Sequence, residues 1–109
     1  MLKKTRARYL ALTIDSDEMF GSREFMNAVW DAVLRLYGEY GASQTGLALI
    51  EYDVEKNLAI LRTVHTTVDM VRAALASITK IRDRPVAIHV LAVSGTIKAL
   101  SKKIRQYAT

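Results

Sequence analysis

Apolar residues along the 109-residue chain gather in short runs that are separated by polar turns. Four runs have the length of β-strands, and nearly every position in them is apolar. A sheet with one face in water would alternate apolar and polar residues, so we expect both faces of this sheet to be covered. The expected strands are residues 8–14, 47–52, 58–64 and 86–93.

Two segments between these strands have helical spacing. We expect the first helix to begin at Ser22, as its N-cap, and to run through Tyr37. Its expected buried stripe is Phe25, Val29, Ala32, Val33 and Leu36. We expect the second helix to begin at Thr66 or Thr67, with Asp69 in a capping-box-like position. Its expected buried stripe is Val68, Val71, Leu75 and Ile78.

Glycine, proline and acidic residues indicate the connections. Residues 38–46 contain three glycines and predict a loop, residues 53–57 predict a hairpin turn, and residues 83–85 are expected to end the second helix. A last helix should follow residues 94–96 and reach about Tyr107. Its expected inward stripe is Ile97, Leu100 and Ile104.

The resulting order is βαββαβ followed by a helix. This order predicts a single α+β domain over residues 1–109, a ferredoxin-like or RNA-recognition-motif-like sandwich. The first two helices should cover one face of the sheet, which leaves the added C-terminal helix to cover the second face.

The amino-acid composition excludes several classes of protein. Half of the residues are hydrophobic and a quarter are charged, a balance typical of folded proteins. The chain has no cysteine, which excludes disulfides, thiolate zinc sites and a cysteine nucleophile. The most apolar run, residues 86–93, is too short to cross a bilayer, and no signal-type segment follows the charged N-terminus. We therefore expect a cytoplasmic protein without membrane contact.

The net charge of +5 is concentrated at the two ends of the chain. Eight basic residues and no acidic residue lie in the two end clusters, so the other eight basic residues face all eleven acidic ones and give −3 between them. If the fold brings the ends together, they form one surface suited to phosphate; otherwise these residues merely aid solubility. The clusters are Lys3, Lys4, Arg6 and Arg8, and Lys98, Lys102, Lys103 and Arg105.

The segment Ser94-Gly95-Thr96-Ile97-Lys98 is the strongest local indication of a binding site. Free amide groups at a helix start bind anions, the two hydroxyls add donors, and Lys98 adds positive charge. Ordinary capping by Ser94 or Thr96 explains the hydroxyls but not the basic residues that follow.

Side chains that could support other chemistry form no convincing set. Asp15, Asp17 and Glu18 could bind magnesium, but an acidic turn before a helix is favoured in any case. We expect no metal site and no catalytic residue. His89, mid-strand among apolar residues, is expected to be a structural side chain satisfied by a hydrogen bond, and His65 is equally compatible with RNA contact and a structural role. Because Tyr9 is the only candidate aromatic on the central strands, we expect no base stacking across the sheet.

Several segments together resemble one family of small ribonuclease P subunits, known in archaea as protein component 2 and shared with eukaryotes. The resemblance follows the order of the chain, with VSGTIK as its most specific segment, and residues 81–84 depart from the glycine-like turn expected there. The segments are RYLAL at 8–12, GEYGAS at 38–43, LIEYD at 49–53, ILRTVH at 60–65 and VSGTIK at 93–98.

This resemblance implies a non-catalytic protein that supports a catalytic RNA in removing the 5′ leader from precursor tRNA. It implies a larger, barrel-shaped protein partner (component 3), magnesium on the RNA subunit, and only indirect contact with precursor tRNA. A homodimer or a heterotetramer is compatible with it. The apolar first helix, with Met26 and Trp30, is a candidate protein-binding surface.

The candidate RNA contacts come from two sources. The resemblance supplies Arg8, Tyr9, Arg62, His65, Ser94, Gly95, Thr96 and Lys98. Charge placement adds Lys102, Lys103 and Arg105. Two alternatives remain at this point: a small-molecule-binding or regulatory ferredoxin-like domain with its ligand at residues 38–46, and a metal-dependent nuclease that uses Asp15 and Asp17.

Overall fold

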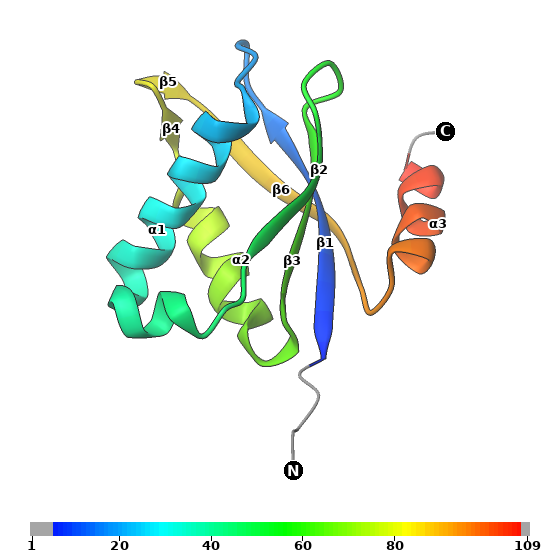
Figure 1. The fold of residues 1–109 in the computed structure, drawn as a ribbon. Helices are drawn as coiled ribbons and strands as arrows, with labels where there is room; N and C mark the ends of the chain where they lie inside the picture. The colour runs from blue at the N-terminus through cyan, green and yellow to red at the C-terminus, as the bar shows by residue number, and fades with distance from the viewer. Residues whose placement is uncertain (1–5, 108–109) are drawn as a thin grey trace.

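The computed structural model describes residues 6–107 and arranges them as one four-stranded antiparallel sheet between two unequal helical layers (Figure 1). The strand order is β2-β3-β1-β6, which confirms the ferredoxin-like topology. The elements are β1 (Ala7–Asp15), α1 (Ser22–Ser43), β2 (Ala48–Asp53), β3 (Leu58–Val64), the short 3-10 helix η1 (His65–Thr67), α2 (Val68–Ser77), β4 (Lys80–Ile81), β5 (Arg84–Pro85), β6 (Ala87–Ser94) and α3 (Ile97–Tyr107).

The main core lies between the sheet and the pair α1 and α2. It contains eighteen buried apolar residues, of which Leu10, Leu12 and Ile14 come from the central strand β1. Burying this much apolar surface is the main favourable term in folding. Its largest fully buried side chains are Phe20, Phe25, Leu10, Leu12, Leu61 and Leu75.

The second face of the sheet is covered only in part. Beneath α3 the buried residues are Ala11, Ile60 and Leu100, with Tyr9, Ala92 and Ile104 partly buried around them. The expectation that the C-terminal helix covers the second face is therefore confirmed over β1 and the adjoining parts of β3 and β6, but the cover does not extend over the edge strand β2 and the start of β6. Ile50, Glu51, Ala87 and His89 are exposed on those strands.

The inward stripe of α3 is shorter than the spacing suggests. Leu100 is fully buried and Ile104 is half-buried, but Ile97 is 43% exposed. Ile97 is the first residue of α3, at the turn where the chain leaves β6, so the prediction that it faces inward is wrong.

α1 is longer than predicted and is kinked. Gly38 has φ 72° and ψ −179°, a conformation that essentially only glycine adopts, and the chain then resumes helix to Ser43. The loop prediction is therefore wrong for residues 38–43. Leu36, just before the kink, is 46% exposed, so the buried stripe of this helix stops at Val33 and resumes at Ala42.

The N-cap of α1 differs from the prediction, whereas the N-cap of α2 agrees with it in position. Gly21 is the N-cap of α1, and its N–H donates to the Glu24 carboxylate at 3.2 Å, so Ser22 is the first helical residue. Thr67 is the N-cap of α2, but its hydroxyl donates to the Val64 carbonyl at 2.9 Å instead of capping. No capping bond to Asp69 is present among the described residues.

α2 ends earlier than the breaker residues suggest. The last helical residue is Ser77, and a small hairpin, β4–β5, follows it. Its two turn residues, Arg82 and Asp83, have φ values of 51° and 62°. Both φ values are left-handed, as type I′ hairpin turns require. The tight turn therefore forms at residues 81–84 although the sequence there contains no glycine.

Candidate nucleic-acid interface

The start of β1 and the ends of β3 and β6 lie side by side at one end of the sheet, at the bottom of Figure 1. Tyr9 pairs with Arg62 on one side and with Ser94 on the other. The His65 N–H donates to the Arg6 carbonyl at 2.8 Å, and His65 Nδ1 lies 3.2 Å from the same oxygen. We call this region the basic end, comprising Arg6, Arg8, Tyr9, Arg62, His65, Ser94, Gly95, Thr96 and Lys98.

The fold places Arg8, from the first charged cluster, against the turn that precedes the second cluster. A Cβ placed on Gly95 would lie 3.6 Å from Arg8 Nη1, so the Arg8 guanidinium lies against the turn between β6 and α3. Arg8 also donates to the Ala7 carbonyl at 3.0 Å, which holds it near the strand. Lys3 and Lys4 lie outside the described residues.

The turn between β6 and α3 is capped as the sequence suggests. Thr96 Oγ1 accepts the Ala99 N–H at 3.1 Å, and Ser94 Oγ accepts the Thr96 N–H at 3.4 Å. Ser94 is buried, whereas Gly95, Thr96 and Lys98 are exposed. The turn thus presents backbone, one hydroxyl and one ammonium group to solvent beside Arg8.

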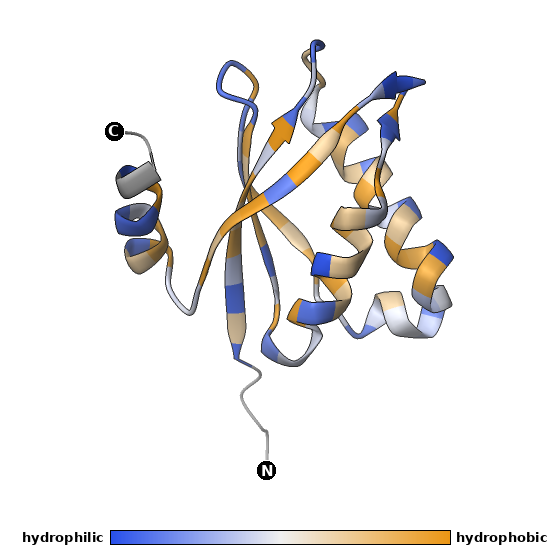
Figure 2. Cartoon of the chain, turned by 180° about the vertical axis from the view of Figure 1, so that it is seen from behind, coloured by the Kyte–Doolittle hydropathy of each residue, from blue (hydrophilic) through white to orange (hydrophobic). Residues whose placement is uncertain are grey.

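Most cations of α3 point away from the sheet. Lys98, Lys102 and Arg105 are exposed, and hydrophilic segments dominate the visible turns of α3 in Figure 2, whereas β6 is mostly apolar. Lys103 differs, because its Nζ donates to the Val93 carbonyl at 2.8 Å. The two ion pairs within residues 6–107 involve other residues, so acidic side chains do not neutralise this surface there.

The remaining predicted contact residues divide by exposure. Arg62 and His65 are exposed, but Tyr9 is half-buried beside the cluster under α3. Its ring is thus not available for stacking while α3 lies in place. His89 is exposed on the edge strand β6, opposite Thr13. Its ring has no hydrogen-bond partner among the described residues, so the prediction of a hydrogen-bonded structural histidine is not confirmed.

The candidate protein-binding residues lie on α1. Met26 and Trp30 are partly buried against the main core. Three other large side chains of this helix are more exposed, including Leu36, which was expected in the buried stripe. They are Leu34, Leu36 and Tyr40, of which Tyr40 is 81% exposed.

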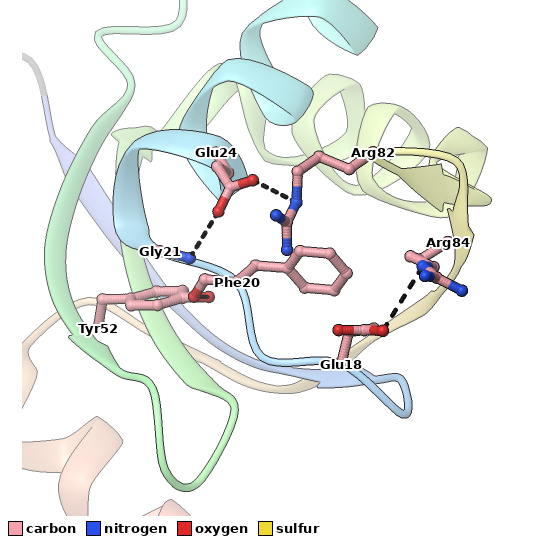
Figure 3. A network of polar contacts seen from close by, with 7 residues as sticks. All are labelled: Glu18, Phe20, Gly21, Glu24, Tyr52, Arg82 and Arg84. Carbon is pink, nitrogen blue, oxygen red and sulfur yellow. Dashed lines mark hydrogen bonds and ion pairs between the residues drawn. The ribbon is translucent and has the colours of Figure 1, made fainter.

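The opposite end of the sheet carries a polar network that the sequence analysis missed (Figure 3). Glu24 forms an ion pair with Arg82, whose guanidinium lies 5.3 Å above the Phe20 ring. The Tyr52 hydroxyl donates to the Phe20 carbonyl at 2.7 Å. Burial, and secondarily the Glu24 charge, raises the pKa of Tyr52. The one sequence signal for this network was Glu24, which follows Gly21 at the three-residue spacing of a capping box.

The acidic side chains that suggested a metal site do not gather around one point. Asp15 and Asp17 are exposed, and Glu18 Oε1 lies 3.5 Å from Arg84 Nε. Within residues 6–107, no three His, Asp or Glu side chains lie close enough together to share a metal ion.

The described surface is hollowed at several places, of which two are well defined. One, of about 550 Å³, lies between α1 and residues 77–82, and a smaller one, of about 290 Å³, lies between α2 and β6. Residues 38–46, the ligand loop of the small-molecule alternative, line neither of them. No helix among the described residues has the length and apolar character needed to cross a membrane.

Comparison with known proteins gives consistent matches. The model of the Rpp14/Pop5 family matches residues 8–105. Ribonuclease P protein component 2 of Pyrococcus abyssi is 36% identical over 105 residues, which cover 95% of this chain and 89% of the relative. The protein of the same name from Methanobrevibacter smithii is 36% identical over 106 residues, covering 91% of this chain and 88% of the relative.

A solved structure has the same fold. A chain in the cryo-EM structure of yeast ribonuclease MRP superposes with a TM-score of 0.71, covering 99% of this chain and 98% of that one. The two sequences are 15% identical, so this likeness concerns the fold alone.

Proposed function

The chain belongs to the Rpp14/Pop5 family, and we propose that it is a non-catalytic protein subunit of ribonuclease P that binds the RNA of that enzyme. In this proposal the RNA removes the 5′ leader from precursor tRNA and binds the magnesium ions, while the protein supports the folded RNA. Precursor tRNA then meets this protein only indirectly.

One observation supports the RNA-binding part of the proposal more than any other. Arg8, from the N-terminal charged cluster, adjoins Gly95 in the turn that leads into the cationic helix α3, and no acidic partner within residues 6–107 neutralises the described cations of the two clusters. Exposed cations beside backbone and hydroxyl groups bind phosphate without reading base sequence. We propose that the basic end, together with Lys102, Lys103 and Arg105, holds the RNA backbone.

A protein partner fits a different surface. α1 exposes Leu34, Leu36 and Tyr40 and also carries the half-buried Met26 and Trp30, and apolar groups exposed on a small protein favour association. We propose that this surface binds the larger, barrel-shaped protein subunit, component 3. The same surface is compatible with a homodimer and with a heterotetramer of the two proteins.

Reconstitution tests the proposed function. A ribonuclease P RNA, the larger protein subunit and this chain are mixed, and removal of the 5′ leader is followed at a magnesium concentration at which the RNA alone is slow. We expect cleavage to need this chain as well as the larger subunit. Cleavage that does not depend on this chain would contradict the proposal, and cleavage by the isolated chain would identify it as a nuclease in its own right.

A further inference from the structure

The ring of Tyr9 lies at the centre of a row of side chains on the second face of the sheet. Residues that pair across antiparallel strands project to the same face, so Arg62, Tyr9 and Ser94 form this row. The next row on the same face is Ile60, Ala11 and Ala92. An aromatic ring, an adjacent guanidinium group and an apolar floor are the parts of a surface on which an unpaired base stacks.

α3 covers this surface but is weakly attached to it. The cluster beneath α3 has three buried residues, of which α3 supplies only Leu100, whereas the main core has eighteen. Ile97 is 43% exposed. Because the hydrophobic contribution scales with buried apolar area, detaching α3 costs much less than opening any other helix of the described chain.

The charges of α3 favour an open state when RNA is present. Lys98, Lys102 and Arg105 are exposed and lack an acidic partner within residues 6–107, and the exposed Gly95 lies in the turn that connects α3 to β6. A helix that swings about this turn stays next to the basic end. Its cations can then contact phosphates that flank a base bound on Tyr9.

We propose that α3 is a lid over a nucleobase site on Tyr9 and Arg62, and that it opens when an unpaired stretch of RNA binds. The proposal rests on the proposed RNA-binding function and adds to it a ligand class, a single-stranded nucleotide. Bases inside a duplex are already stacked and cannot reach the ring, so duplex RNA binds only the basic end.

A lid of this kind predicts that a substitution which weakens the packing of α3 strengthens RNA binding. The apparent dissociation constant equals the intrinsic constant divided by the fraction of molecules that are open. Loosening the lid therefore tightens binding, whereas general damage to the fold weakens it.

The test compares Leu100→Ala with the unaltered chain. We expect the variant to bind an oligouridylate of about ten nucleotides about threefold to tenfold more tightly and to bind duplex RNA unchanged. Adding Tyr9→Leu should remove the gain. The matched control is Leu75→Ala, which removes the same atoms from the main core and should not tighten binding. The lid proposal is overturned if a folded Leu100→Ala variant binds oligouridylate no more tightly than the unaltered chain does. It is also overturned if the affinity of the variant for duplex RNA rises by the same factor.

Hydrogen exchange on the unaltered chain provides a test that needs no variant to fold. Oligouridylate should speed exchange of the α3 amides and leave those of α1 and α2 unchanged; slower exchange in α3 overturns the proposal. Failure of the lid proposal can be distinguished from failure of the proposed RNA-binding function. If the chain binds ribonuclease P RNA but α3 does not respond to oligouridylate, only the lid is wrong, whereas a chain that binds no RNA contradicts the proposed function itself.

Discussion

At the scale of single residues, Tyr52 ties three parts of the chain together. Its hydroxyl donates to the Phe20 carbonyl at 2.7 Å, and its ring packs 5.4 Å from that of Phe25, centroid to centroid. The donor comes from β2, the acceptor from the segment between β1 and α1, and the packed ring from α1. The loop before α1 is thus fixed by a hydrogen bond that no local sequence pattern predicts.

Replacing Tyr52 by phenylalanine should lower the free energy of unfolding by about 1 kcal/mol, because the Phe20 carbonyl loses its donor. The raised pKa of Tyr52 adds a pH dependence. The folded state favours the neutral phenol, so this stabilisation is complete below the ordinary pKa near 10 and is lost as the pH rises through the raised value.

Urea unfolding of the unaltered chain and of the Tyr52→Phe variant between about pH 8 and pH 11 measures both effects. The difference in stability between these two proteins should shrink above about pH 10. Tyr40→Phe, at a position that is 81% exposed, is the control and should stay within about 0.5 kcal/mol of the unaltered chain. A constant difference across this range would contradict the raised pKa of Tyr52, and no difference at about pH 8 would contradict its hydrogen bond to Phe20.

Asp83 occupies a left-handed position, with φ 62°, which costs a residue with a Cβ more than it costs glycine. Asp83→Gly should therefore raise the free energy of unfolding by about 0.5–1 kcal/mol, measured by thermal or urea unfolding. The same replacement at Asp69, in the first turn of α2, should lower it, because glycine is a poor helix former. A loss of stability at Asp83 would contradict the assigned turn.

At the scale of elements, α1 shows how a backbone conformation changes which surface a helix presents. Gly38 breaks the regular φ and ψ values, yet helix resumes and places Ala42 back in the core. The three glycines of residues 38–46 indicated a break correctly but not its length, since glycine permits both a loop and a kink.

Gly38→Ala should cost about 1–3 kcal/mol of unfolding free energy, because alanine rarely adopts this backbone conformation. A Cβ at this position would meet no atom within 4 Å, so the cost is conformational and involves no clash. Differential scanning calorimetry gives the change, with Glu39→Ala, at an exposed neighbour, expected within about 0.5 kcal/mol. Equal stability of Gly38→Ala and the unaltered chain would show that the kink is not needed.

At the scale of the whole molecule, charge is separated along the strands. The cations of the basic end lie at one end of the sheet, and the two ion pairs of the described residues, Arg82 with Glu24 and Arg84 with Glu18, lie around the start of α1 at the other. Such an arrangement orients the protein on a polyanion.

Replacing Lys98, Lys102 and Arg105 together by alanine should weaken RNA binding and reduce the slope of log affinity against log salt by about 2–3, since each lost phosphate contact removes somewhat less than one released counterion. Lys103 is left in place because it donates to the Val93 carbonyl. The matched control removes the same charge from three other exposed cations, Arg23, Lys56 and Lys80. Filter binding at several salt concentrations distinguishes the two, and equal losses in both variants would contradict a localised RNA surface.

The sequence by itself determined the class of fold and the position of each long strand to within about one residue, because strand-length apolar runs and turn residues are local signals. It also determined the family, through short segments such as residues 93–98. The same local patterns indicated the residues of the basic end, although nothing in the chain order places Arg62 beside Tyr9.

Only the tertiary structure decided what those segments do together. It joined Arg8 to Gly95, left Ile97 and His89 exposed, ended α2 at Ser77 and linked Glu24 to Arg82. Each of these depends on which surfaces meet after strands far apart in sequence have paired. Burial and ion pairing are properties of such surfaces, so a one-dimensional pattern of residue types does not contain them.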